Sequence, residues 1–125
     1  QEFDKYDYYF VGSDQIWNPI YGGLSEFGFA YFYSEKKIAI SASFGIEEIP
    51  LDYKGRVKQY ISKFDAISVR EEAAKNIIER ITNRQDIEIL IDPTMMLQKE
   101  EWDRIVKKPK EMLPDKYIVL LFFGN

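Results

Sequence analysis

The 125-residue chain contains no histidine and no cysteine. Without cysteine it has no disulfide and no thiolate, and without histidine it lacks the commonest metal ligand and general base at neutral pH. Zinc sites built on these residues, cysteine–histidine catalysis and Ser-His-Asp triads are therefore excluded within this chain. The sequence predicts neither a metal site nor a bound cofactor.

Long apolar runs are also missing. The longest, Tyr117 to Phe123, has seven residues, whereas a membrane-spanning helix needs about 20. The segment Gln1–Lys5 has neither an initiator methionine nor the pattern of a secretory signal. We therefore expect a cytoplasmic piece of a longer protein, with no transmembrane segment.

Positive charge is scarce at the N-terminal end. Residues 1–35 carry one lysine and six acids, and the whole chain has 17 basic and 21 acidic residues for a net charge of −4. Nucleic acid is therefore not an expected partner. A hydrophobic content of 46% with 30% charged residues is typical of an ordered globular domain.

Short apolar runs alternate with segments of helical spacing. The runs predict strands over 8–11, 37–42, 65–69, 87–91 and 117–123, and the spacing predicts helices over 51–63, 71–82 and 99–107. This alternation indicates an α/β fold, a Rossmann-like three-layer domain with a parallel sheet covered on both faces. The expected buried strand residues are Ile38, Ile40, Ile67, Val69, Ile89 and Ile91.

Ligands of open parallel sheets bind at the carboxyl ends of the strands. Four turns follow predicted strands there: Gly12–Gln15, Ser43–Gly45, Arg70–Glu71 and Asp92–Thr94. Among these turns Arg70 is the one cation. It could bind a carboxylate or phosphate, or it could form a structural salt bridge to Asp14 or Glu71, and both interpretations stay open.

For the other polar residues at these turns, local spacing favours structural roles. Ser13 and Asp14 are typical of a helix N-cap, and Asp92 before Pro93 is typical of a strand end. Ser68 and Glu71 fit a capping box for the following helix. Trp17 is the aromatic residue that we expect to be exposed.

The same turns carry a resemblance to a known family. The segments Phe10–Asn18, Ala39–Gly45, Phe64–Glu71 and Asp92–Thr94 resemble, in order, motifs of the polysaccharide pyruvyl transferases. The resemblance implies the first half of a GT-B-like two-domain architecture. It divides the chain into an N-terminal Rossmann-like domain at 1–107, a linker at 108–116 and the first strand of a C-terminal domain at 117–125.

The resemblance also implies a reaction, in which pyruvate from phosphoenolpyruvate becomes a ketal on a sugar during exopolysaccharide biosynthesis. The implied partners are phosphoenolpyruvate, a sugar or lipid-linked saccharide acceptor and the missing C-terminal domain. Arg70 would hold the donor's carboxylate or phosphate, and Asp14 would orient Arg70 or a sugar hydroxyl. The implied substrate-binding residues are Gly12, Ser13, Gln15, Asn18, Ser43, Phe44 and Gly45.

Two other functions remain open. The chain could belong to a GT-B-like glycosyltransferase, because one architecture hosts many reactions, or it could be a noncatalytic sugar-binding or assembly domain. Neither the acceptor sugar nor the oligomeric state follows from the sequence.

The 125-residue chain by itself should release no phosphate from phosphoenolpyruvate in the presence of sugars. The resemblance places the catalytic acid, a histidine, in the second domain, and a water-excluding cleft needs both domains. A phosphate-release assay checks this, and turnover by the isolated chain would contradict it.

Overall fold

The computed structural model describes residues 6–21, 23–33, 36–107, 109–110 and 112–121. Four strands form one parallel sheet in the order β1-β2-β3-β4. The strands are β1 (Tyr8–Val11), β2 (Lys36–Ala42), β3 (Ala66–Val69) and β4 (Ile87–Ile89). The helices are α1 (Leu51–Ile61), α2 (Glu72–Thr82) and α3 (Lys99–Ile105), with short 3₁₀ turns η2 (Phe27–Phe29) and η3 (Pro93–Met95). The predicted parallel α/β fold is confirmed.

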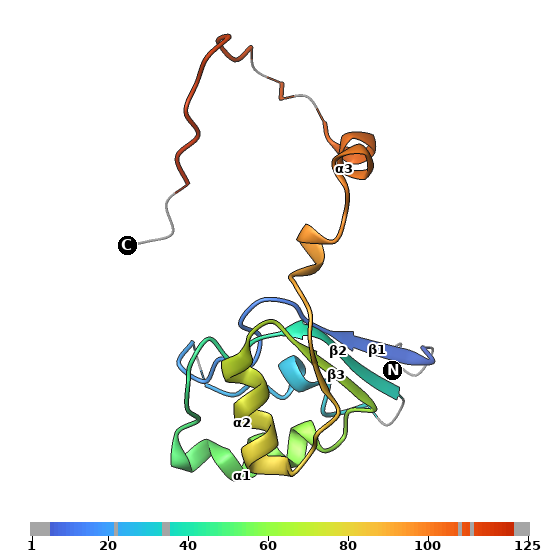
Figure 1. Cartoon of the computed structure of the whole chain (residues 1–125), viewed down its shortest axis with the longest axis vertical. Helices are drawn as coiled ribbons and strands as arrows, with labels where there is room; N and C mark the ends of the chain where they lie inside the picture. The colour runs from blue at the N-terminus through green and yellow to red at the C-terminus, as the bar shows by residue number, and fades with distance from the viewer. Residues whose placement is uncertain (1–5, 22, 34–35, 108, 111, 122–125) are drawn as a thin grey trace.

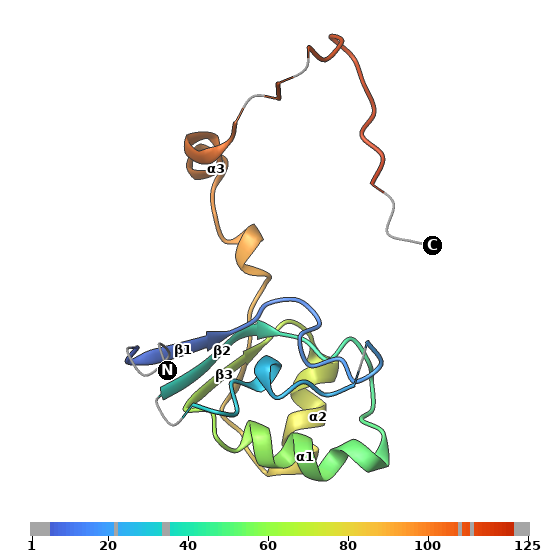
Figure 2. The same cartoon turned by 180° about the vertical axis from the view of Figure 1, so that it is seen from behind.

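One face of the sheet carries the core. α1, α2 and the loop that contains η2 lie on this face (Figures 1 and 2). Inward-facing strand residues are 5% exposed or less, namely Val11, Ala39, Ile67, Val69 and Ile87. Aromatic rings of the loops and of α1 pack with these residues in one core.

Trp17 lies at the centre of that aromatic core. Its side chain is fully buried, with ring centroids 5.3 Å from Phe29 and 5.2 Å from Phe44. Its indole N–H donates to the carbonyl oxygen of Gly28 at 2.8 Å, so its polar atom is satisfied as well. The expectation that Trp17 is exposed is wrong, since the loop 23–33 folds over it.

The opposite face of the sheet is open within the described part of the chain. Ile38 and Ile40 are only half-buried, and a groove of about 490 Å³ runs along this face. Ile89 and Ile91 are 41% and 56% exposed, because they lie at and beyond the end of an edge strand. Of the predicted three layers, the described residues thus form the sheet and the layer on one of its faces. Four of the six strand residues that we expected to be buried are not buried.

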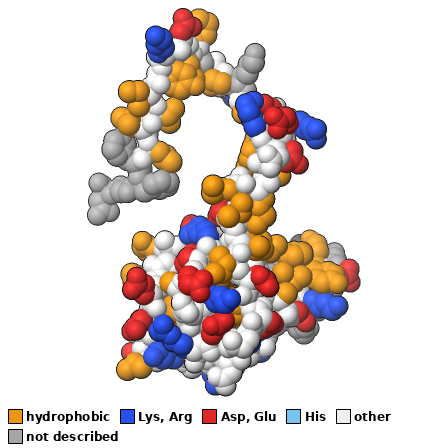
Figure 3. All heavy atoms as spheres, in the orientation of Figure 1, with side chains coloured by type: hydrophobic (Ala, Val, Ile, Leu, Met, Phe, Trp, Pro, Cys, Tyr) orange, Lys and Arg blue, Asp and Glu red, His pale blue; other side chains and the backbone are white. Residues whose placement is uncertain are grey.

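Hydrophobic side chains also gather on the β1 side of the sheet (Figure 3). α3 and the segments 109–110 and 112–121 lie away from the sheet in both views (Figures 1 and 2). Residues 112–121 form neither helix nor strand, so the predicted fifth strand is absent over its described part, 117–121. Residues 122–125 lie outside the described residues, and the division into two domains stays a prediction.

The capping box predicted for Ser68 and Glu71 does not form. Ser68 belongs to β3, and Glu71 is the N-cap of α2 without a side-chain cap bond. The Ser68 hydroxyl instead accepts from the N–H of Ser41 and donates to the carbonyl of Ala39, both at 3.0 Å. These bonds satisfy the backbone where the β2–β3 register shifts between Ala39 and Ala42.

Gly12 brings the loop after β1 against β2 and should not tolerate a side chain. It has φ +142°, and a Cβ there would lie 1.9 Å from the carbonyl oxygen of Ile40. Gly12→Ala should therefore lower the free energy of unfolding by about 2 kcal/mol or more. Denaturant unfolding measures the change.

Gly55→Ala is the matched control. Gly55 lies within α1, and a Cβ there would meet nothing within 4 Å. This variant should gain about 0.5–1 kcal/mol from helix propensity. If Gly12→Ala were as stable as Gly55→Ala, the close approach of the loop to β2 would be contradicted.

Candidate functional site

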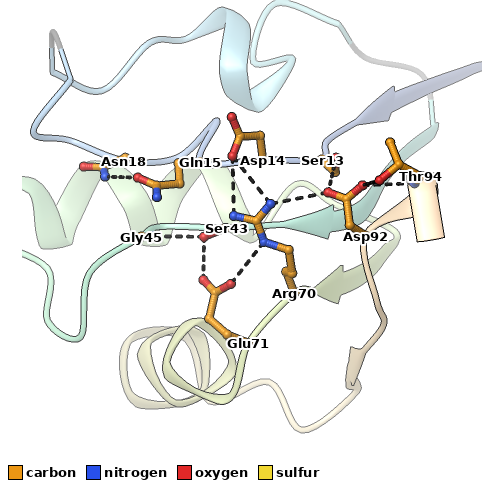
Figure 4. A network of polar contacts seen from close by, with 10 residues as sticks. All are labelled: Ser13, Asp14, Gln15, Asn18, Ser43, Gly45, Arg70, Glu71, Asp92 and Thr94. Atoms are coloured by element: carbon orange, nitrogen blue, oxygen red, sulfur yellow. Dashed lines mark hydrogen bonds and ion pairs between the residues drawn. The ribbon is translucent and has the colours of Figure 1, made fainter. Parts of the chain in front are cut away.

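Arg70 follows β3 and lies at the carboxyl edge of the sheet (Figure 4). Its side chain is 30% exposed and contacts three carboxylates. Its terminal nitrogens lie 3.4 Å from Asp14 and 3.3 Å from Asp92, and its Nε lies 3.7 Å from Glu71. Because these acids follow β1 and β4 and begin α2, the guanidinium joins segments far apart in the sequence. Both salt bridges considered from the sequence, to Asp14 and to Glu71, are present.

Asp92 is the most firmly held of the three carboxylates. Its Oδ1 accepts from the N–H and the hydroxyl of Thr94 at 3.0 and 2.7 Å, and its Oδ2 accepts from the Ser13 hydroxyl at 2.9 Å. These bonds, those from Thr94 first, lower the pKa of Asp92 to about 2, with a smaller contribution from Arg70. β4 ends at Ile89, so Asp92 caps η3 and joins two loops instead of ending the strand.

Glu71 belongs to the site but was not among the predicted site residues. Its Oε1 accepts from the Ser43 hydroxyl at 2.5 Å, and that hydroxyl in turn accepts from the N–H of Gly45 at 2.9 Å. Ser43 is 1% exposed. The sequence signal for Glu71 was its position directly after Arg70, at the end of a predicted strand. From the sequence, Glu71 was interpreted only as part of a capping box or as a salt-bridge partner of Arg70.

Asp14 is held differently from the other two acids. Its side chain is 87% exposed, and within the described residues it contacts Arg70 alone. The N-cap interpretation of Ser13 and Asp14 is wrong, because Ser13 bonds to Asp92 and Asp14 to Arg70. The backbone of Asp14 has φ +36°, a conformation that aspartate and asparagine tolerate better than most residues.

The loop after β1 closes on the loop after β2. Asn18 donates to the side-chain oxygen of Gln15 at 2.7 Å, and its own oxygen accepts from the N–H of Ile20. Gly45 has φ +62°, and a Cβ there would lie 2.2 Å from Gln15 Oε1. These contacts bring the predicted residues Gln15, Asn18, Ser43 and Gly45 together.

Beside this contact lies a cleft of about 220 Å³. Its lining comprises Gln15, Ser43, Gly45, Ile46, Glu47, Arg70, Glu71 and Ala73. Of the predicted substrate-binding residues, Gln15, Ser43 and Gly45 line this cleft, and Gly12, Ser13, Asn18 and Phe44 do not. The Phe44 ring is fully buried against Trp17. The turns that the sequence indicated thus meet at one edge of the sheet, and the binding of a substrate by these residues stays a prediction.

The charge balance around Arg70 is negative. One positive guanidinium faces three negative carboxylates, so the net charge of the group is 1 − 3 = −2.

No group of three or more acidic residues in the described ranges has the arrangement of a metal site. No helix among the described residues is long and apolar enough to cross a bilayer.

Stability should fall as the pH is lowered from about 4 to about 2, and Asp92 should account for part of the loss. Its folded pKa of about 2 lies below its ordinary value of 3.8. Its contribution is therefore complete above pH 4 and disappears as the pH falls through 2. Asp92→Asn should be less stable than the wild type at pH 7, with a smaller difference at pH 2.

Urea unfolding at both pH values measures this effect. Asp7→Asn, which removes the same charge from an exposed position before β1, serves as the control and should leave the difference between the two pH values unchanged. If the stability of Asp92→Asn fell with pH as much as that of the wild type, Asp92 would not account for the loss of stability at low pH.

Comparison with known proteins agrees with the pattern of motifs at this edge. The family model of polysaccharide pyruvyl transferase matches residues 2–123. No curated protein and no solved structure matches this sequence significantly. The match spans almost the whole chain, including all four turns that meet around Arg70. The chain therefore belongs to the polysaccharide pyruvyl transferase family.

Proposed function

We propose that the edge around Arg70 receives phosphoenolpyruvate, whose pyruvyl group is transferred to a sugar during polysaccharide biosynthesis. In this reaction two sugar hydroxyls add to C2 of the enolpyruvyl group, and the methylene carbon takes up a proton to become a methyl group. Phosphate leaves with the oxygen that joined it to C2. The product is a cyclic pyruvate ketal on the sugar.

The observation that carries this proposal is the position of the Arg70 guanidinium. It lies 30% exposed where the turns after β1, β3 and β4 meet. A planar guanidinium donates two parallel hydrogen bonds to a carboxylate or phosphate. The donor carries both of these groups, and it places them on the same carbon skeleton. Arg70 therefore suits one end of the donor.

The neighbouring polar groups suit the acceptor. A saccharide presents neutral hydroxyls, which both donate and accept hydrogen bonds. Gln15, Ser43 and Glu71 line the cleft beside Arg70, and Asp14 is exposed next to it. Ionised carboxylates accept from hydroxyls, so this half of the site can orient the two attacking oxygens.

This edge leaves two requirements of the reaction to other residues. Protonation of the methylene carbon needs an acid, and the chain contains no histidine. The donor carries up to three negative charges, whereas the Arg70 cluster already has a net charge of −2. We propose that a second domain, beginning near residue 117, supplies the acid and further cations.

Arg70→Lys in the full-length protein should lower kcat/KM for phosphoenolpyruvate by roughly ten- to a hundredfold. The lysine keeps the charge but loses the bidentate geometry, and a charge-assisted hydrogen bond contributes about 1.5–3 kcal/mol. The melting temperature should change little, because the ion pairs of Arg70 are long and partly exposed. Phosphate-release kinetics and thermal unfolding measure the two effects.

Arg84→Lys is the matched control. Arg84 donates to the backbone oxygens of Phe64 and Asp65 and pairs with Asp86, away from the carboxyl edge. This substitution should lower the melting temperature and leave kcat/KM unchanged. If Arg70→Lys instead behaved like Arg84→Lys, Arg70 would be structural and the proposed function of this edge would be wrong.

A further inference from the structure

We propose that Asp14 is an exchangeable partner of Arg70. An anionic group of the donor replaces Asp14 on the guanidinium, and the released carboxylate then accepts a hydrogen bond from a hydroxyl of the acceptor sugar. This inference rests on the proposed function, because it takes Arg70 as the donor's binding group.

The argument begins with an asymmetry among the three carboxylates around Arg70. Asp92 is held by Ser13 and Thr94 as well as by Arg70. Glu71 is held by a 2.5 Å hydrogen bond from Ser43. Both would therefore keep their positions if Arg70 turned to another partner. Their side chains are also less exposed than that of Asp14, with Asp92 at 19% and Glu71 at 34%.

Asp14 has no such second anchor within the described residues. Its Oδ1 alone is shared by both terminal nitrogens of Arg70, at 3.4 and 3.5 Å. Charge-assisted hydrogen bonds between a guanidinium and a carboxylate are usually 2.7–2.9 Å long. The Asp14 side chain is 87% exposed, so water screens its pairing with Arg70, and surface ion pairs contribute about 0–1 kcal/mol. Asp14 is therefore the least firmly anchored of the three carboxylates, although the ion pair between Arg70 and Glu71 is longer, at 3.7 Å.

Asp14 occupies the terminal nitrogens of Arg70, which an anionic ligand needs for bidentate binding. The Nε of Arg70 faces Glu71, and one terminal nitrogen also faces Asp92. The pair of terminal nitrogens remains for bidentate binding, and Asp14 lies against both of them (Figure 4). A phosphate or carboxylate that arrives from solvent can bind there with two oxygens, whereas Asp14 uses one. The ligand therefore makes the better contact.

Displacement also changes what Asp14 can do. While paired, its Oδ1 is shared with the guanidinium. Once released, the exposed carboxylate has free lone pairs beside the cleft that Gln15, Ser43 and Glu71 line. A sugar hydroxyl is a suitable donor to it. Repulsion between the bound anion and Asp14 would further favour a position turned toward the acceptor.

Binding of phosphoenolpyruvate to the full-length Asp14→Asn variant tests the proposal, by calorimetry in the absence of acceptor. Removing the competing carboxylate should lower the dissociation constant about two- to fivefold. Asparagine tolerates positive φ as aspartate does, so the backbone of the turn is retained. Inorganic phosphate and pyruvate, titrated separately, show which anionic group of the donor replaces Asp14.

Two aspartates provide matched controls. Asp7→Asn removes the same charge from an exposed residue before β1 and should leave the dissociation constant unchanged. Asp92→Asn neutralises an anchored carboxylate and should not tighten binding. In steady-state kinetics, Asp14→Asn should raise KM for the acceptor while KM for the donor does not rise, a division that a purely structural residue would not produce.

The possible outcomes separate this inference from the proposed function. If Arg70→Gln weakens donor binding but Asp14→Asn leaves it unchanged or weaker, the exchange is overturned and the assignment of Arg70 stands. If Arg70→Gln binds the donor as the wild type does, the assignment of Arg70 fails together with the exchange. Equal tightening by Asp14→Asn and Asp7→Asn would indicate a general charge effect and would also overturn the exchange.

Discussion

The ion pairs of one arginine connect three of the turns at the carboxyl edge of this sheet. Arg70 contacts carboxylates that follow β1 and β4 and the one that begins α2. Through Asp92 these contacts extend to Ser13, and through Glu71 they extend to Ser43. Parallel strands place their ends at one edge, and these side chains add to backbone bonds that join the loops there, from Trp17 N–H to Ser43 O and from Ser43 N–H to Asp14 O. Arg70 therefore lies where the polar contacts of the turns after β1, β3 and β4 converge.

The same contacts limit what this edge can do alone. Three carboxylates around one guanidinium give a site that is hydrogen-bonding and negative overall, which suits a polyol better than a trianionic donor. An anion can still bind where a weakly held carboxylate gives way, and Asp14 fits that description. The membership of the chain in the polysaccharide pyruvyl transferase family is consistent with a site that is shared with other residues.

The sequence predicted the parts of the fold that local pattern controls. Apolar runs located β1, β2 and β3 to within one residue, and the topology of parallel strands brought the four turns to one edge. Prediction from the sequence failed where contacts between distant residues determine the position of a side chain. Trp17 is buried by a loop with no periodic pattern, Ser68 satisfies a register shift in place of a cap, and Phe44 packs beneath the site. Whether Asp14 caps a turn or pairs with Arg70 depends on a residue 56 positions away.

A crystal structure of the full-length protein with phosphoenolpyruvate would test the role of Arg70 most directly. We expect a carboxylate or phosphate oxygen of the donor within hydrogen-bond distance of both terminal nitrogens of Arg70, with Asp92 and Glu71 in place and Asp14 turned away. A donor bound elsewhere, with Arg70 still paired to all three carboxylates, would contradict this assignment.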